Sequence, residues 1–156
     1  MGHVNTQITL KSIYDVKQAK EGNLPENKIR QATVDVMVDT GATTLVINEQ
    51  LFQQLGLDVI GEREISLANC GCRRWHISHL LKKFFRYDSR TNETCKVTDA
   101  LEINWEDRSF TMPALVVDNA PDFLLGVLPL EGMDLVVDTV NQKLVGAHGD
   151  HPVYRV

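Results

Sequence analysis

The sequence predicts an all-β fold, a closed and mostly antiparallel β-barrel with one or two short helices. Apolar and β-branched residues recur with the two-residue period of strands along most of the chain, and polar turn segments separate the short runs. A chain of 156 residues is long enough for one hydrophobic core and too short for two. Many short strands around one core predict closure into a barrel, and residues 1–156 are expected to form a single, one-lobed domain.

The N-terminal part of the chain is expected to supply an outer strand, a polar connection and a long central strand. Residues 4–10 alternate weakly, as an outer strand does, and residues 21–28 form a polar turn region that contains glycine and proline. Residues 29–39 are predicted to be a long strand because valines recur at every second position. Residues 43–47 are predicted to lead away from the turn that follows this strand.

A short helix is predicted at residues 48–55. Asn48 is a typical N-cap residue, Glu49 suits the positive N-terminal end of a helix, and Gly56 is placed to end it. The apolar stripe of this helix consists of Leu51, Phe52 and Leu55.

Strand patterns resume after this helix. They cover residues 57–68, 94–105, 109–118, 123–125, 135–138 and 142–145. Residues 106–107 and 139–142 are predicted turns between strands, and the proline-containing residues 128–133 are predicted to make one helical turn.

The most informative stretch is the predicted turn Asp39-Thr40-Gly41, which lies between two apolar runs. A strand on each side would hold the carboxylate rigidly, and glycine permits a backbone conformation or a close approach that a Cβ would block. The tripeptide alone is common by chance, but the strand–turn–strand setting makes it more specific. A second segment, Leu124-Leu125-Gly126, places two bulky apolar residues before a glycine.

Together, Asp39-Thr40-Gly41-Ala42 and Leu124-Leu125-Gly126 resemble the retropepsin-like aspartic proteases, in particular their small, single-lobed bacterial members. The resemblance implies an acid-protease barrel in which the apolar-apolar-Gly strand passes behind the aspartate turn and supports it. It implies that Asp39 is catalytic, that Thr40, Gly41 and Ala42 support the turn, and that Thr40 bonds across a dimer axis. Retroviral-type members often carry pairing charges where this chain has Thr43-Thr44 and Val127-Leu128, so that bracing differs or is absent.

Peptide hydrolysis by this route needs two carboxylates that share one proton and hold a water between them. Asp138 is a rival to Asp39, but Val140 stands where the turn needs glycine, so Asp138 is not expected to be catalytic. The second carboxylate is therefore expected from another copy of the chain, related by a two-fold axis. We expect a homodimeric aspartic endopeptidase acting on a peptide or protein substrate. The alternative is an inactive dimeric barrel that binds a peptide or protein without cutting it.

Residues 70–91 depart from the strand pattern and are strongly basic. They are interpreted as an insertion at the place where the family carries its flap. Cys70, Cys72, His76 and His79 suggest a zinc site, but structural zinc sites usually space their cysteines by two to four residues. We therefore expect no metal and no organic cofactor. A helix is also predicted here, and its apolar face consists of Ile77, Leu80, Leu81, Phe84 and Phe85. This face is expected to cover the barrel as a lid, or alternatively to contact a membrane surface or a protein partner.

Bulk properties bound the possible partners. A net charge of −5 gives no reason to expect nucleic acid as a partner. No apolar stretch is long enough to span a bilayer, and the N-terminus does not resemble a signal peptide. Three cysteines, Cys70, Cys72 and Cys95, cannot all pair within the chain, which favours a reducing, cytoplasmic location.

Overall fold

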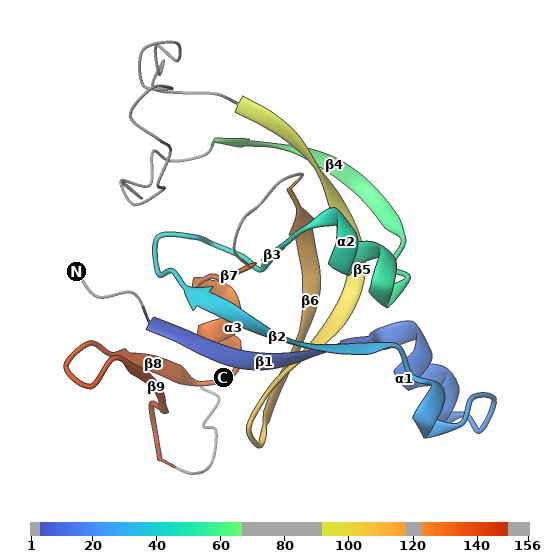
Figure 1. The fold of residues 1–156 in the computed structure, drawn as a ribbon, viewed down its shortest axis with the longest axis horizontal. Coiled ribbons are helices and arrows are strands. Elements are labelled where there is room, and N and C mark those ends of the chain that lie inside the picture. The colour runs from blue at the N-terminus through green and yellow to red at the C-terminus, as the bar shows by residue number, and fades with distance from the viewer. Residues whose placement is uncertain (1–3, 67–91, 118–122, 150–156) are drawn as a thin grey trace, which may run out of the picture.

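The computed structural model describes residues 4–66, 92–117 and 123–149, and Figure 1 shows how their strands and helices are arranged. The strands are β1 (Val4–Ser12), β2 (Gln31–Val38), β3 (Val46–Ile47), β4 (Val59–Ser66), β5 (Asn92–Trp105), β6 (Arg108–Val116), β7 (Phe123–Leu125), β8 (Leu135–Asp138) and β9 (Lys143–Gly146). The helices are α1 (Ile13–Lys20), α2 (Glu49–Leu55), α3 (Val127–Gly132) and the short 3-10 helix η1 (Glu26–Lys28).

The main sheet runs in the order β1-β2-β7-β3-β6-β5-β4, and a further pairing of β1 with β5 closes it. Within the ring, β2–β7 and β3–β6 are the parallel pairs among the described strands, and the other pairs are antiparallel. β8 and β9 form a separate antiparallel hairpin. The prediction of a closed, mostly antiparallel barrel is therefore confirmed.

One hydrophobic core fills the barrel. Its fully buried members include Ile8 and Leu10 of β1, Leu101 and Ile103 of β5, and Leu125 of β7. Within β1 and β5 these residues are two positions apart, so they point to the same face of the strand, as the sequence pattern predicts.

Helix α2 begins and ends as predicted. The Asn48 side chain accepts a hydrogen bond of 2.9 Å from the Leu51 N–H, which makes it the N-cap. Gly56 ends the helix with a φ of 57°, in the left-handed region that favours glycine.

Helix α1 was not predicted, and the expectation of one or two short helices was too low. Asp15 and Val16 are its buried residues, so the helix has almost no apolar stripe from which periodicity could reveal it. An ion pair anchors it instead: Arg30 donates to both Asp15 carboxylate oxygens at 2.7 Å. Hydrogen bonds from the Arg30 side chain hold the pKa of Asp15 below its ordinary value.

The strand after the aspartate turn is shorter than predicted, because β3 contains Val46 and Ile47 alone. Residues 43–45 still bond to neighbouring segments: Leu45 O accepts the Leu115 N–H at 3.0 Å, and Thr43 O accepts the Leu128 N–H at 3.0 Å. Residues 70–91, with the predicted insertion, its helix and the Cys/His group, lie outside the described residues, and those interpretations stay predictions.

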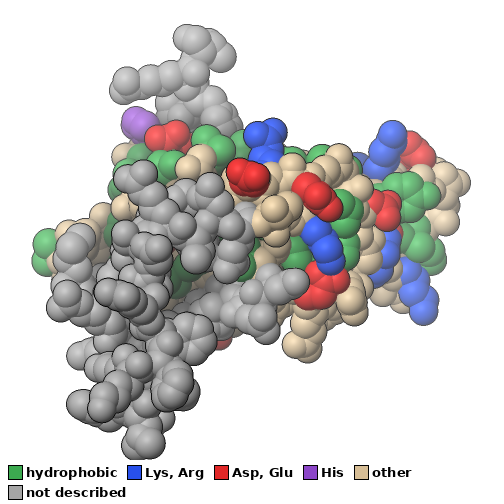
Figure 2. Space-filling model, turned by 90° about the horizontal axis from the view of Figure 1, so that it is seen from above, with side chains coloured by type: hydrophobic (Ala, Val, Ile, Leu, Met, Phe, Trp, Pro, Cys, Tyr) green, Lys and Arg blue, Asp and Glu red, His purple; other side chains and the backbone are tan. Residues whose placement is uncertain are grey.

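The described acidic and basic side chains are interspersed on the face of the molecule that Figure 2 shows. In the described part of the chain, no helix is both long enough and apolar enough to cross a membrane.

Candidate active site

Asp39 directly follows β2, at the point where the chain turns toward β3. Its N–H donates to Leu125 O at 3.1 Å, and its C=O accepts the Ala42 N–H at 3.0 Å. The Gly41 N–H donates to Asp39 Oδ1 at 2.8 Å. The half-buried carboxylate is thus oriented by its own turn, while Thr40 and Gly41 are exposed.

β7 lies between the two strands that flank this turn. Leu125 pairs with Val38 of β2 in parallel, and Leu124 pairs with Val46 of β3 in the antiparallel sense. Leu125 is also part of the core. The two predicted segments therefore lie side by side, and the apolar one joins the aspartate turn to the interior of the barrel.

Gly126 is the residue at which the chain leaves β7 against the turn. A Cβ placed on it would lie 2.5 Å from Thr44 O, 2.6 Å from Thr44 N and 2.7 Å from Ala42 O. Such distances are far inside van der Waals contact, so only glycine fits without a shift of the backbone. Gly41 is tight for a different reason, since a Cβ there would lie 3.1 Å from Asp39 Oδ1.

The residues after Gly126 continue the contact with the turn, which reasoning from side chains missed. The Val127 N–H donates to Ala42 O at 2.9 Å, and the Leu128 N–H donates to Thr43 O at 3.0 Å. The sequence shows no charged pair at these positions, and the structure ties them together through main-chain atoms instead. Backbone bonds of this kind leave no signal in residue type apart from the glycine that permits the approach.

Asp138 lies at the end of β8 and orders the tight connection to β9. Its Oδ1 accepts the N–H groups of Val140 and Asn141, both at 3.0 Å, and its Oδ2 accepts the Asn141 side-chain amide at 2.6 Å. These bonds, above all that from the Asn141 side chain, hold the pKa of Asp138 below its ordinary value. Val140 is 88% exposed, so the hairpin tip points to solvent.

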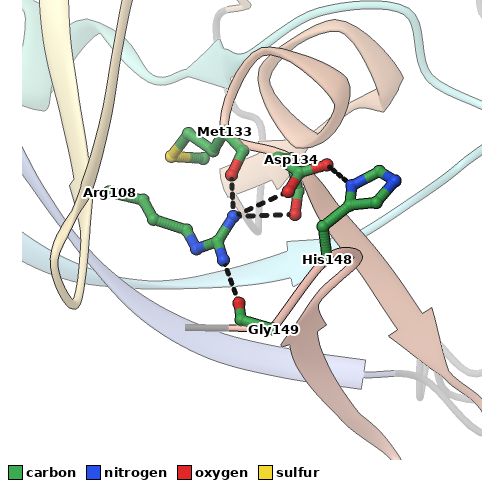
Figure 3. Close-up of polar contacts among 5 residues, drawn as sticks. All are labelled: Arg108, Met133, Asp134, His148 and Gly149. Atoms are coloured by element: carbon green, nitrogen blue, oxygen red, sulfur yellow. Dashed lines mark hydrogen bonds and ion pairs between the residues drawn. The ribbon is translucent and has the colours of Figure 1, made fainter. Parts of the chain in front are cut away.

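A second polar cluster, which the sequence did not reveal, lies beyond the other end of α3 (Figure 3). Arg108 is 3% exposed and donates from Nη1 to Met133 O and Asp134 O, both at 2.9 Å, and to Asp134 Oδ2 at 3.2 Å. Its Nη2 donates to Gly149 O, and His148 Nδ1 lies 2.7 Å from Asp134 Oδ1. The cluster fixes the end of α3 and the chain after β9 to the barrel.

No group of three or more His, Cys, Asp or Glu residues among those described is arranged to hold a metal ion. The candidate ligands Cys70, Cys72, His76 and His79 fall outside that set.

A sequence model of the aspartyl protease family matches residues 26–76, a segment that contains Asp39-Thr40-Gly41-Ala42. Among solved structures, the chain is similar to a retropepsin-like aspartic protease from Rickettsia conorii, with 15% identity and a TM-score of 0.45 over 88% of this chain and 77% of that one. No curated protein matches the chain. The family match across the aspartate turn confirms the predicted resemblance to aspartic proteases.

Proposed function

We propose that this protein is an aspartic endopeptidase that hydrolyses peptide bonds with a water activated between two Asp39 carboxylates, one from each subunit of a homodimer. The observation that carries the proposal is the bracing of the Asp39 turn. Main-chain bonds to Leu125, Val127 and Leu128 hold its inner side, while Thr40 and Gly41 on its outer side are exposed. A second copy has access to such a turn, and a rigid carboxylate suits acid–base chemistry.

The chemistry follows from two carboxylates that share one proton. Two negative charges about 3 Å apart repel each other strongly, so one proton between the two carboxylates relieves the repulsion. The ionised Asp39 takes a proton from the water as it attacks the peptide carbonyl, and its protonated partner donates to the carbonyl oxygen. The two carboxyl groups then exchange roles when the amine leaves. This reaction needs no metal or organic cofactor.

The neighbouring residues have positioning roles in this proposal. The Gly41 N–H donates to Asp39 Oδ1 and so orients the carboxylate. Thr40 bonds across the dimer axis, and Ala42 offers no side-chain hydroxyl to the carboxylate. Leu124, Leu125 and Gly126 support the turn from the barrel side.

Asp39→Asn tests the assignment, because the amide is nearly isosteric but cannot act as the acid–base group. We expect cleavage of a peptide library to fall by several orders of magnitude, with an unchanged circular dichroism spectrum and dimer mass. The matched control is Asp138→Asn, which changes the other Val-Asp-Thr aspartate and should leave cleavage intact. Full activity of Asp39→Asn would exclude this mechanism.

Mixing the two proteins tests the shared site. The two proteins are mixed in equal amounts, and activity after subunit exchange is compared with that of wild type at the same total protein concentration. If each site needs two Asp39 residues, about a quarter of the activity remains, because about a quarter of the dimers contain two wild-type chains. If each chain acts alone, about half remains. Retention of half would refute the homodimeric site while leaving an Asp39-dependent enzyme.

The second candidate is a dimeric barrel that holds a peptide without cutting it. The uncharged residues Thr43-Thr44 and Val127-Leu128, at positions where retroviral-type enzymes often carry charges, favour it. In that case wild type cleaves no member of the library, and Asp39→Asn binds the same peptides with unchanged affinity.

A further inference from the structure

β4 and the first part of β5 form a two-stranded arm, which we define as residues 61–66 and 92–95. Among the described strands, β4 pairs with β5 alone, and β5 pairs with β6 only from Lys96 onward. Each strand of the arm therefore has a single described partner. In Figure 1 the arm curves toward the side of the molecule at which β2 ends and Asp39 follows.

The arm leaves the barrel at two irregularities in strand pairing that lie at the same level. The register of β4 against β5 shifts between Val59 and Gly61, and that of β5 against β6 shifts between Val97 and Ala100. Val59 pairs with Thr98, so both shifts fall on one short stretch of β5. Bulges bend a strand and increase its twist, which makes this stretch the bend of the arm.

Side chains of two neighbouring residues hold the bend. Thr98 is fully buried, and its hydroxyl donates to Asp99 O at 2.7 Å and accepts the Ala114 N–H at 2.9 Å. Asp99 and Asp58 bond reciprocally: the Asp99 N–H donates to Asp58 O at 2.8 Å, and the Asp58 N–H donates to Asp99 Oδ1 at 3.1 Å. Asp58 lies between α2 and β4, so these bonds join the bend to the segment after α2.

A second link joins α2 to Lys96, the residue of β5 that directly follows the arm. Lys96 Nζ lies 2.9 Å from Glu49 Oε2 and 5.7 Å from the centre of the Phe52 ring. Helix α2 follows β3, and β3 follows the Asp39 turn. Both links therefore connect the base of the arm to the part of the chain that continues from the Asp39 turn.

The environment of Asp99 sets this carboxylate apart from the exposed carboxylates of the arm. Burial raises its pKa, and Asp58 and Arg30 are the charged groups that act on it, with Arg30 paired to Asp15. Partial removal from water disfavours the ionised Asp99 side chain, and the hydrogen bond that it accepts from the Asp58 N–H offsets part of this desolvation cost.

We propose that Asp99 is a positioning residue, whose reciprocal bonds with Asp58 set the angle at which the arm leaves the barrel and so its height relative to the Asp39 turn. The consequence for substrate rests on the proposed endopeptidase function. In the peptidase, the arm bears on a peptide bound at Asp39, so Asp99 affects how tightly the peptide is held and leaves the acid–base step unchanged.

Hydrogen exchange of the arm tests the proposal without reference to activity. Asp99→Ala removes the acceptor of the Asp58 N–H, and we expect exchange in residues 61–66 and 92–95 to accelerate about fivefold, with β1 and β2 unchanged. Asp99→Asn keeps an oxygen at Oδ1 and should exchange like wild type. Glu62→Ala, which removes an exposed carboxylate of the arm itself, is the matched control and should have no effect. Unchanged exchange in Asp99→Ala, an equal acceleration throughout the barrel, or identical behaviour of Asp99→Ala and Asp99→Asn would overturn the proposal.

Kinetics then separate positioning from a merely structural role. For a peptide that wild type cleaves, Asp99→Ala should raise KM about fivefold and change kcat less than about twofold, and Asp99→Asn should restore KM. A changed kcat with an unchanged KM would overturn the positioning role. If wild type cleaves nothing, the endopeptidase proposal fails, and the exchange experiment still decides whether Asp99 sets the arm.

Discussion

Gly126→Ala provides a quantitative test of how the candidate site is built. Gly126 has φ −83° and ψ −173°, an extended backbone that alanine adopts readily, so any penalty is steric. The new Cβ would meet Thr44 O, Thr44 N and Ala42 O at 2.5, 2.6 and 2.7 Å. Overpacking usually destabilises by about 1–3 kcal/mol, and here the obstacles are backbone atoms that cannot rotate away, so we expect about 3 kcal/mol or more. That corresponds to a fall in Tm of roughly 6–12 °C for a chain of this length.

The measurement is urea unfolding followed by circular dichroism, supported by a thermal melt. Gly61→Ala is the matched control, because a Cβ at Gly61 has no neighbour within 4 Å, and this exposed glycine should tolerate the change within about 1 kcal/mol. If the free energy of unfolding of Gly126→Ala lies within about 1 kcal/mol of the wild-type value, or if both variants lower it equally, the turn does not depend on the close approach of Gly126.

Two further predictions concern the polar groups around α3 and the β8–β9 hairpin. Arg108→Met removes the buried guanidinium that pairs with the Asp134 carboxylate and should cost about 3–5 kcal/mol in urea unfolding, whereas Arg63→Met, at an exposed site, should cost little. Asp138→Ala should lower stability at neutral pH, because bonds such as that from Asn141 depress the folded pKa and their contribution is present above the ordinary value of 3.8. The difference from wild type should shrink as the pH falls through the depressed pKa, and a difference that does not change with pH would contradict this reasoning.

Local patterns predict most of this fold. In a strand with one buried face, apolar residues recur at every second position, and most of the described strands lie near the positions that this pattern predicts. Helix α2 is predicted because its sequence carries a capping residue at each end. Local patterns do not predict helix α1, because the contact that anchors it is not local: Asp15 bonds to Arg30, 15 residues further along the chain. A contact between two charged residues at that separation produces no periodicity, so it can be read only from the folded chain.

The candidate site divides in the same way. Asp39 and Gly126 are marked by residue type, since the proposed reaction needs a carboxylate at the first and the second has no room for a Cβ. The main-chain bonds of Val127 and Leu128 to the turn are possible for any residue except proline, so their side chains carry no record of them. The burial of Arg108 likewise cannot be predicted from the sequence, because its partner Asp134 lies 26 residues away and belongs to no motif.

The two Val-Asp-Thr sequences of this chain show why the surroundings of a tripeptide decide its use. Asp138 is the last residue of β8 and Asp39 directly follows β2, and each accepts an N–H from two residues further on, at 2.8 Å for Asp39 and 3.0 Å for Asp138. The bonds of the Asp138 carboxylate stay within its own hairpin, whose tip extends into solvent with no strand of the barrel paired to it among those described. At Asp39 the turn lies against β7 and the barrel core. An aspartate that stabilises its own hairpin gains little from rigidity. The acid–base pair that we propose at Asp39 depends on it, because two carboxylates from different chains would have to meet within hydrogen-bonding distance of one water.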